Sequence, residues 1–168
     1  MTEPDRALPI AAIFADSGAG DVLIAFAREV QGQGVRVRGL IQRQEPDMHL
    51  VDIQSGQEFA ITQDLGPDSD ACRIDPAGFA EASVVLRDAL AERAELVVIN
   101  RFGKLEAAGG GLAAEMLAVM AEGLPVLTCV NGEQVAAWRS FTGDAGLLLP
   151  ADITALRAWW RGQRSNLR

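Results

Sequence analysis

The stretch that decides the fold is Leu8-Pro9-Ile10-Ala11-Ala12-Ile13-Phe14, which continues as Ala15-Asp16-Ser17-Gly18-Ala19-Gly20-Asp21-Val22-Leu23. Its first half is an unbroken apolar run, which is typical of a strand covered on both faces of a sheet. Its second half is rich in small residues and leads into Val22, Phe26 and Val30, which recur at helical spacing. The stretch therefore predicts a buried strand, a glycine-containing loop and a helix, in that order.

The loop resembles a phosphate-binding loop in shape, but its charge is reversed. Nucleotide-binding loops place Gly-x-x-x-x-Gly-Lys-Ser/Thr at this point, and here Ala15, Gly20, Asp21 and Val22 occupy the four defining positions. Backbone amides at the start of the helix are expected to hold an oxyanion, which makes candidate ligand-binding residues of Ser17, Gly18, Ala19 and Gly20. Asp21 would repel a polyphosphate by roughly 4 kcal/mol at 4 Å near a protein surface. The alternative is that Asp21 only caps the helix.

The rest of the chain alternates strand and helix patterns. Further strands are expected over 35–42, 96–99, 125–130 and 146–149, and further helices after Pro76, Gly111, Asn131 or Glu133, and Asp152. A β-hairpin insertion is expected over about 47–63, around the turn 54–57. This alternation predicts a single α/β domain over 1–168, with three α/β/α layers and a mainly parallel sheet.

Composition excludes several classes of function. The 168 residues suit one domain, and the net charge of −8 disfavours a nucleic-acid partner. No apolar run reaches the roughly 18 residues of a membrane span, and no leader pattern is seen, so a cytoplasmic protein is expected. Arginines cluster at 36–43 and 157–168. Trp159 and Trp160 are adjacent on one expected helix, which suggests that one of them marks a partner or dimer surface in a homo-oligomer.

Ligands of parallel sheets bind beyond the carboxyl ends of the strands. The loops 15–21 and 100–106 are expected there, and the polar segment 63–75 is expected to join them. These two later segments supply the remaining candidate ligand-binding residues, which are Asp64, Cys72, Arg73, Asp75, Asn100 and Lys104. A thiol at a helix start can ionise, and a guanidinium can hold an oxyanion. The alternatives are a solvated loop with Asp75 as a helix cap, and a surface role for Lys104. Cys129 is expected in the core, and the identity of any metal stays open.

Two families resemble the chain. The run 98–106 (Val-Ile-Asn-Arg-Phe-Gly-Lys-Leu-Glu) is similar to the strand-end motif Asp-Glu-Ile/Val-Gly-Lys-Met-Glu of small nucleoside-triphosphatases first described in thermophiles. Asn100 and Arg101 replace the acidic pair, whereas Gly103, Lys104 and Glu106 match. Over nearly its whole length the chain resembles a related bacterial family of uncharacterised function, through the segments 63–76 and 100–104. This resemblance implies a P-loop NTPase-like fold, and members of that family are often encoded beside molybdate-transport genes.

The expected function follows from a retained loop without hydrolytic groups. A magnesium-dependent triphosphatase needs a lysine in the loop and a carboxylate after the later strand, and Asp21 and Asn100 stand there. We therefore expect a non-hydrolytic binding or regulatory protein for a small anion or nucleotide-like ligand. The expected ligand is a molybdate-like oxyanion or a nucleotide, and the family resemblance connects the protein to molybdenum metabolism. The first alternative is an unusual nucleoside triphosphatase. The second is a protein-interaction scaffold without a small ligand.

Overall fold

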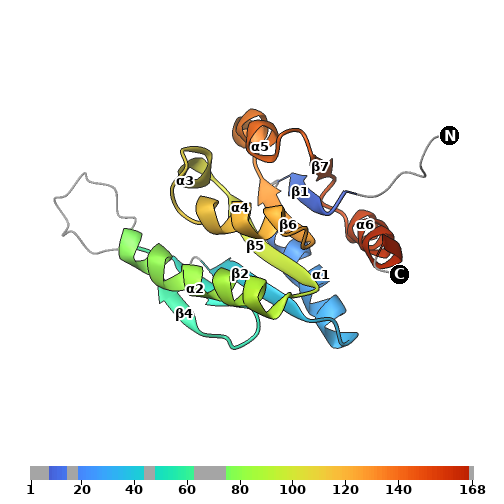
Figure 1. The fold of residues 1–168 in the computed structure, drawn as a ribbon, viewed down its shortest axis with the longest axis horizontal. Coiled ribbons are helices and arrows are strands. Elements are labelled where there is room, and N and C mark those ends of the chain that lie inside the picture. The colour runs from blue at the N-terminus through green and yellow to red at the C-terminus, as the bar shows by residue number, and fades with distance from the viewer. Residues whose placement is uncertain (1–7, 15–18, 44–47, 63–74, 167–168) are drawn as a thin grey trace.

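Seven strands of the described chain form one sheet, in the order β4-β3-β2-β5-β6-β1-β7 (Figure 1). The structure is a computed structural model that describes residues 8–14, 19–43, 48–62 and 75–166. The strands are β1 (Ile10–Phe14), β2 (Val37–Arg43), β3 (His49–Asp52), β4 (Glu58–Ala60), β5 (Leu96–Phe102), β6 (Val126–Val130) and β7 (Gly146–Leu149).

The sheet is parallel except at one edge. β2, β5, β6, β1 and β7 pair in parallel, and β3 and β4 continue the sheet beyond β2 as an antiparallel hairpin. This hairpin is the insertion predicted over about 47–63, and it widens the sheet at its edge. β6 lies between β1 and β5. The carboxyl ends of β1 and β5 are thus separated by two strand spacings, about 10 Å.

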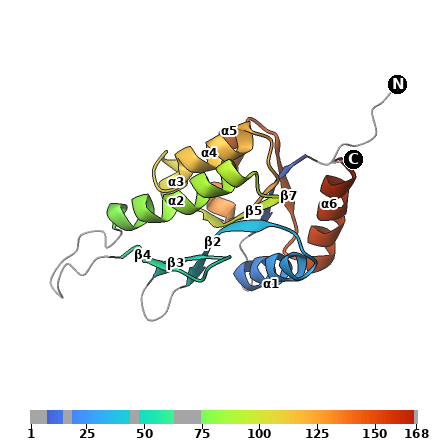
Figure 2. The same ribbon diagram turned by 60° about the horizontal axis from the view of Figure 1, so that its bottom comes forward.

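Helices cover both faces of the sheet, as Figure 2 shows. They are α1 (Ala19–Gly32), α2 (Pro76–Glu92), α3 (Lys104–Ala107), α4 (Ala113–Ala121), the 3-10 helix η1 (Gly132–Gln134), α5 (Val135–Thr142) and α6 (Ile153–Asn166). Along β1, Ala11 and Ile13 belong to the core beneath α1 and α6, whereas Ile10 and Ala12 belong to the core beneath α2, α4 and α5. The predicted α/β class, with three layers and a P-loop NTPase-like arrangement, is confirmed.

The helix α2 begins as the sequence predicts. Asp75 is its N-cap, with Oδ1 accepting a hydrogen bond from the Ala77 N–H at 3.0 Å, and Pro76 stands at the first helical position. The Asp75 N–H also donates to the carbonyl of Ile61 at 2.8 Å. The two ends of segment 62–74 are therefore joined by a main-chain hydrogen bond at the start of α2.

The prediction that one tryptophan of α6 marks a partner or dimer surface is wrong, because neither side chain is exposed. Trp159 and Trp160 are both 5% exposed. Trp159 Nε1 donates to the carbonyl of Leu8 at 2.9 Å, and the guanidinium of Arg164 lies 5.6 Å from the Trp160 ring. Adjacent helical residues point about 100° apart. The helix α6 packs against α1 and also contacts Leu8, which precedes β1. Its buried arc is therefore wide enough for both rings.

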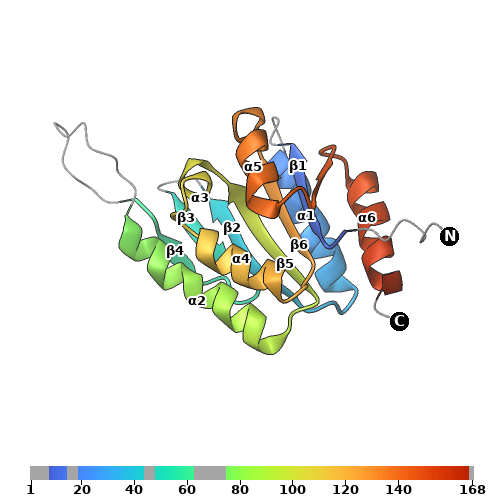
Figure 3. The same ribbon diagram turned by 45° about the horizontal axis from the view of Figure 1, so that its top comes forward.

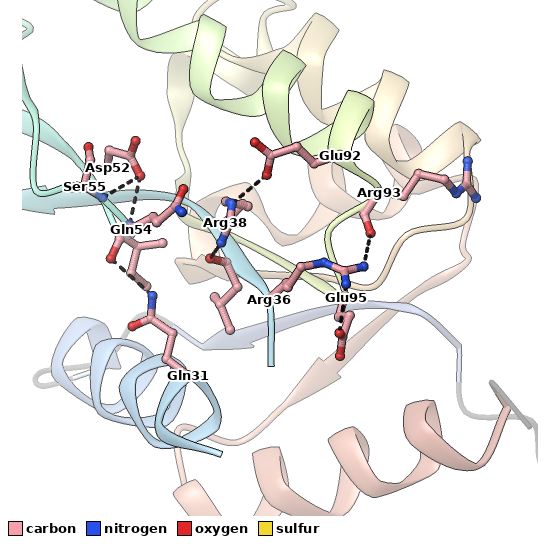
Figure 4. Close-up of polar contacts among 11 residues, drawn as sticks. Gln31, Arg36, Arg38, Asp52, Gln54, Ser55, Glu92, Arg93 and Glu95 are labelled. Carbon is pink, nitrogen blue, oxygen red and sulfur yellow. Dashed lines mark hydrogen bonds and ion pairs between the residues drawn. The ribbon is translucent and has the colours of Figure 1, made fainter. Parts of the chain in front are cut away.

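Ion pairs hold the arginines that cluster in the sequence. Arg38 Nε donates to Glu92 Oε2 at 2.8 Å, and Arg36 pairs with Glu95 at 3.7 Å and donates from Nη2 to the carbonyl of Arg93 at 3.2 Å (Figure 4). Both arginines lie where β2 begins, at the edge of the sheet opposite the carboxyl ends of the strands. On α6, Arg157 forms a double hydrogen bond with Glu29, which lowers the pKa of that carboxyl. No helix in the described ranges has the length and apolar character needed to cross a membrane.

Candidate functional site

A pocket of about 310 Å³ opens at the carboxyl ends of β2 and β5. It lies on the face of the sheet that α2 and α4 cover, and Figure 3 shows these two helices side by side over the sheet. Its walls come from β2, β3, the residue after β4, α2, the end of β5 and the loop around α3. The lining residues are Leu40, Gln42, Met48, Leu50, Ile61, Phe79, Ile99, Asn100, Arg101, Gly103, Lys104, Leu105, Glu106 and Leu112. This position is where open α/β sheets bind ligands.

A β-bulge shapes the end of β5 at this pocket. Ile99 pairs with Thr128 and Phe102 pairs with Val130, so three steps along β5 match two along β6. The extra residue falls at Asn100 and Arg101, and bulges of this kind often re-aim side chains next to functional sites. Phe102 then returns to the core, where its ring centroid lies 5.3 Å from that of Trp138. The bulge is thus anchored by an aromatic contact directly after it.

Asn100 carries an unusual polar atom. Its Oδ1 is buried and has no hydrogen-bond partner among the described residues. Buried polar atoms in folded proteins nearly always have a partner, and one without a partner calls for an explanation. Because Asn100 lines the pocket, a bound molecule with an N–H or O–H group would supply the missing donor.

Two cations stand beside this amide. Lys104, the only lysine of the chain, begins α3, and Arg101 occupies the bulge. Both side chains are exposed, and neither forms an ion pair with an acidic residue within the described ranges. The rim of the pocket therefore has positive charge available for an anionic group.

Glu106 is the carboxylate nearest in sequence to these cations, and each of its two oxygens accepts a main-chain hydrogen bond. It is 6% exposed, and Oε1 accepts from the Gly103 N–H at 3.0 Å while Oε2 accepts from the Leu112 N–H at 3.2 Å. A Cβ at Gly111, where φ is +56°, would lie 1.9 Å from Oε2. Glu106 therefore fixes the loop between β5 and α4 through both of its carboxylate oxygens.

The structure brings some predicted site residues together and separates others. Asn100 and Lys104 share the pocket. Ala19 and Gly20 form the first turn of α1, and they do not line this pocket. Asp75 serves as the cap of α2. The remaining predicted ligand-binding residues lie outside the described part of the chain. They are Ser17, Gly18, Asp64, Cys72 and Arg73.

Sequence reasoning missed the pocket walls contributed by β2, β3 and α2. Leu40, Leu50 and Phe79 were visible only as apolar positions of strands and a helix. The useful signal was the hairpin insertion, which lengthens the sheet edge that forms one wall. Within the residue ranges given above, no three His, Cys, Asp or Glu side chains are grouped closely enough to hold a metal.

Cys129 is a core residue, as predicted, and it makes stability depend on pH. It is 3% exposed, and burial raises the pKa of its thiol from 9.0 to about 12, with a smaller opposing effect of the Arg101 charge. In the unfolded chain the thiol ionises near its ordinary value, so its contribution is complete below pH 9 and is lost as the pH rises toward 12.

We expect the stability advantage of the native chain over Cys129→Ala to shrink by about 1.4 kcal/mol between pH 8 and pH 10. Urea denaturation of both proteins under reducing conditions measures this difference. Because all other titrating groups are common to the two proteins, their contributions cancel in the comparison. Equal pH dependence of the two proteins would contradict the assignment of Cys129 to a dry environment.

Comparisons with known proteins identify relatives of the whole domain. The family model described as "Protein of unknown function (DUF2478)" matches residues 10–159. "Molybdenum import ATP-binding protein ModC 2" from Bradyrhizobium diazoefficiens is 40% identical over 156 residues, which cover 88% of this chain and 17% of that protein. The chain thus spans about a sixth of the length of this curated relative. No solved structure matches the chain significantly.

Proposed function

We propose that this chain, which belongs to the family Protein of unknown function (DUF2478), is a non-hydrolytic binding or regulatory protein for a small anion or nucleotide-like ligand. A link to molybdenum is supported by its similarity to a protein named for molybdenum import and ATP binding. The resemblance to thermophile-type triphosphatases, and the expected neighbourhood of molybdate-transport genes, favour the same ligand classes.

The observation that carries the proposal is the Asn100 oxygen, which has no hydrogen-bond partner among the described residues and lies in a pocket lined also by Arg101 and Lys104. A site of this kind binds a molecule that brings both a donor and a negative charge. We expect no hydrolysis because of the residues that stand at the end of β5. Magnesium-dependent phosphoryl transfer needs a carboxylate at the end of this strand. The amide of Asn100 occupies that position, and both oxygens of Glu106 already accept main-chain hydrogen bonds.

Residues 15–22 enter the proposal through their sequence, which resembles that of a phosphate-binding loop. We place the main-chain amides of residues 17–20 on an anionic group, with Asp64, Cys72 and Arg73 as further contacts. Because β6 separates β1 from β5, a ligand that reaches from the carboxyl end of β1 to Asn100 must span about 10 Å. A nucleotide has this reach, whereas a bare oxyanion would occupy only one of the two places.

The test is calorimetric titration with molybdate, tungstate, phosphate, ATP and GTP, beside a phosphate-release assay with magnesium. We expect binding without turnover. Asn100→Ala is expected to weaken binding about tenfold, because a hydrogen bond of roughly 1 to 1.5 kcal/mol is lost. Gln54→Ala is the control, since Gln54 is exposed in the turn between β3 and β4 and does not line the pocket. Absence of heat with every probe would overturn the proposal.

A nucleoside triphosphatase is the second candidate, favoured by the ATP-binding name of the relative. Magnesium-dependent release of phosphate that Asn100→Ala abolishes and Gln54→Ala retains would establish it. A third candidate, an interaction scaffold or homo-oligomer, would be supported by light scattering that shows a stable assembly, together with no response to any small ligand.

A further inference from the structure

The walls of the pocket do not suit a bare oxyanion. Its deeper part is formed by buried alkyl side chains, among them Leu40, Leu50 and Ile99, with the half-buried ring of Phe79 opposite the strands. Molybdate and phosphate are strongly hydrated, and their transfer against alkyl walls without hydrogen bonds is costly. The part of a ligand that fills this space is therefore apolar or aromatic.

The polar groups of the pocket add two further requirements. The Asn100 oxygen accepts a hydrogen bond, so the buried part of the ligand carries an N–H or O–H donor. Lys104 and Arg101 stand at the rim with exposed side chains, so the outer part of the ligand carries a negative charge. A volume of about 310 Å³ lies at the small end of organic ligand sites.

Resting on the proposed function, we infer that this pocket binds a flat organic anion, a nitrogen heterocycle that carries a phosphate or carboxylate group. The ring lies between Phe79 and the strands β2 and β5. A ring or amino N–H donates to Asn100 Oδ1, and the anionic group lies at Lys104. The heterocycle gives affinity through the apolar area that it buries, and the amide gives it one orientation.

The first experiment separates the ring from the anion. GMP, AMP and UMP are titrated in parallel with ribose 5-phosphate and inorganic phosphate, which have the anion without the heterocycle. We expect at least one nucleotide to bind ten or more times more tightly than ribose 5-phosphate. Phe79→Ala is expected to weaken the nucleotide about tenfold and to leave ribose 5-phosphate unchanged. Val84→Ala, at a 44% exposed position of the same helix, is the control and should change neither.

The second experiment uses the single lysine. Acetylation of the chain with a limiting amine reagent marks only Lys104 and the N-terminal amine, and mass spectrometry distinguishes the two. A saturating nucleotide is expected to slow acetylation of Lys104 several-fold, while the N-terminal amine reacts at an unchanged rate. This readout follows the site itself, and thermal melting of each variant confirms that it is folded.

The outcomes separate the two levels of the proposal. If phosphate or molybdate binds and no nucleotide binds more tightly, the ligand class inferred here is wrong and the proposed function stands. Nucleotide binding that Asn100→Ala and Phe79→Ala leave unchanged, without protection of Lys104, also overturns the inference, because the ligand then lies elsewhere. If no anion or nucleotide binds, ATP and GTP included, the proposed function fails together with the inference.

Discussion

Replacement of Gly39 by alanine is expected to lower the free energy of unfolding by about 4 kcal/mol or more, or to prevent folding. Gly39 lies in β2 with φ at +138°, where side-chain-bearing residues are strained. A Cβ there would lie 1.8 Å from the carbonyl oxygen of Val98 on β5. This oxygen belongs to the main chain of a central strand, so it has no side-chain rotation by which to move away. Chemical denaturation followed by circular dichroism measures the loss.

Gly32→Ala is the matched control for this collision. Gly32 ends α1, its φ lies outside the strained region, and a Cβ there would meet no atom within 4 Å. We expect this change to raise stability by about 0.5 to 1 kcal/mol through helix propensity and reduced freedom of the unfolded chain. If Gly39→Ala were as stable as the native chain, the close approach of β2 to β5 at this register would be incorrect.

Glu106→Ala has the second largest expected effect, a loss of about 2 to 5 kcal/mol. The change removes the acceptor for two main-chain N–H groups, those of Gly103 and Leu112, and leaves them without a partner at a buried position. Each unsatisfied buried donor costs about 1 to 3 kcal/mol. Because both donors hold the loop that contains Lys104, the variant is also expected to weaken any ligand bound at the rim.

Two further variants make this prediction specific. Glu106→Gln retains one acceptor oxygen but turns an NH2 group toward the other donor, so an intermediate loss is expected. Glu133→Ala removes an exposed carboxylate near α5 and should change stability by less than about 0.5 kcal/mol. A Glu106→Ala protein with native stability and no ligand binding would instead make Glu106 a direct ligand contact.

Much of the fold could be predicted because it depends on local patterns. The unbroken apolar run at 8–14 marked a strand covered on both faces, and Asp75 with Pro76 marked the start of α2. The strand order was not accessible, because it depends on which distant segments pair. The insertion of β6 between β1 and β5 follows from long-range packing that no local spacing encodes.

The site was predictable only in part, for a related reason. The placement of Asn100 and Lys104 in the pocket was predictable, because polar residues after a buried strand mark the carboxyl edge of a sheet. Leu50 and Phe79 were missed because a pocket wall and a core position have the same apolar pattern. The bulge in β5 and the short helix α3 depend on tertiary contacts, those of Phe102 with Trp138 and of Glu106 with the loop that it closes.

The hydrogen bond between Asp75 and Ile61 ties the edge of the sheet directly to the start of α2. The main chain on either side of residues 62–74 is therefore held together by a contact of its own. Closing a longer segment adds only about 0.6 kcal/mol for each doubling of its length. A change of length between Ile61 and Asp75 is therefore expected to cost little stability, so a loss of ligand binding in such a variant would report on the proposed contacts Asp64, Cys72 and Arg73.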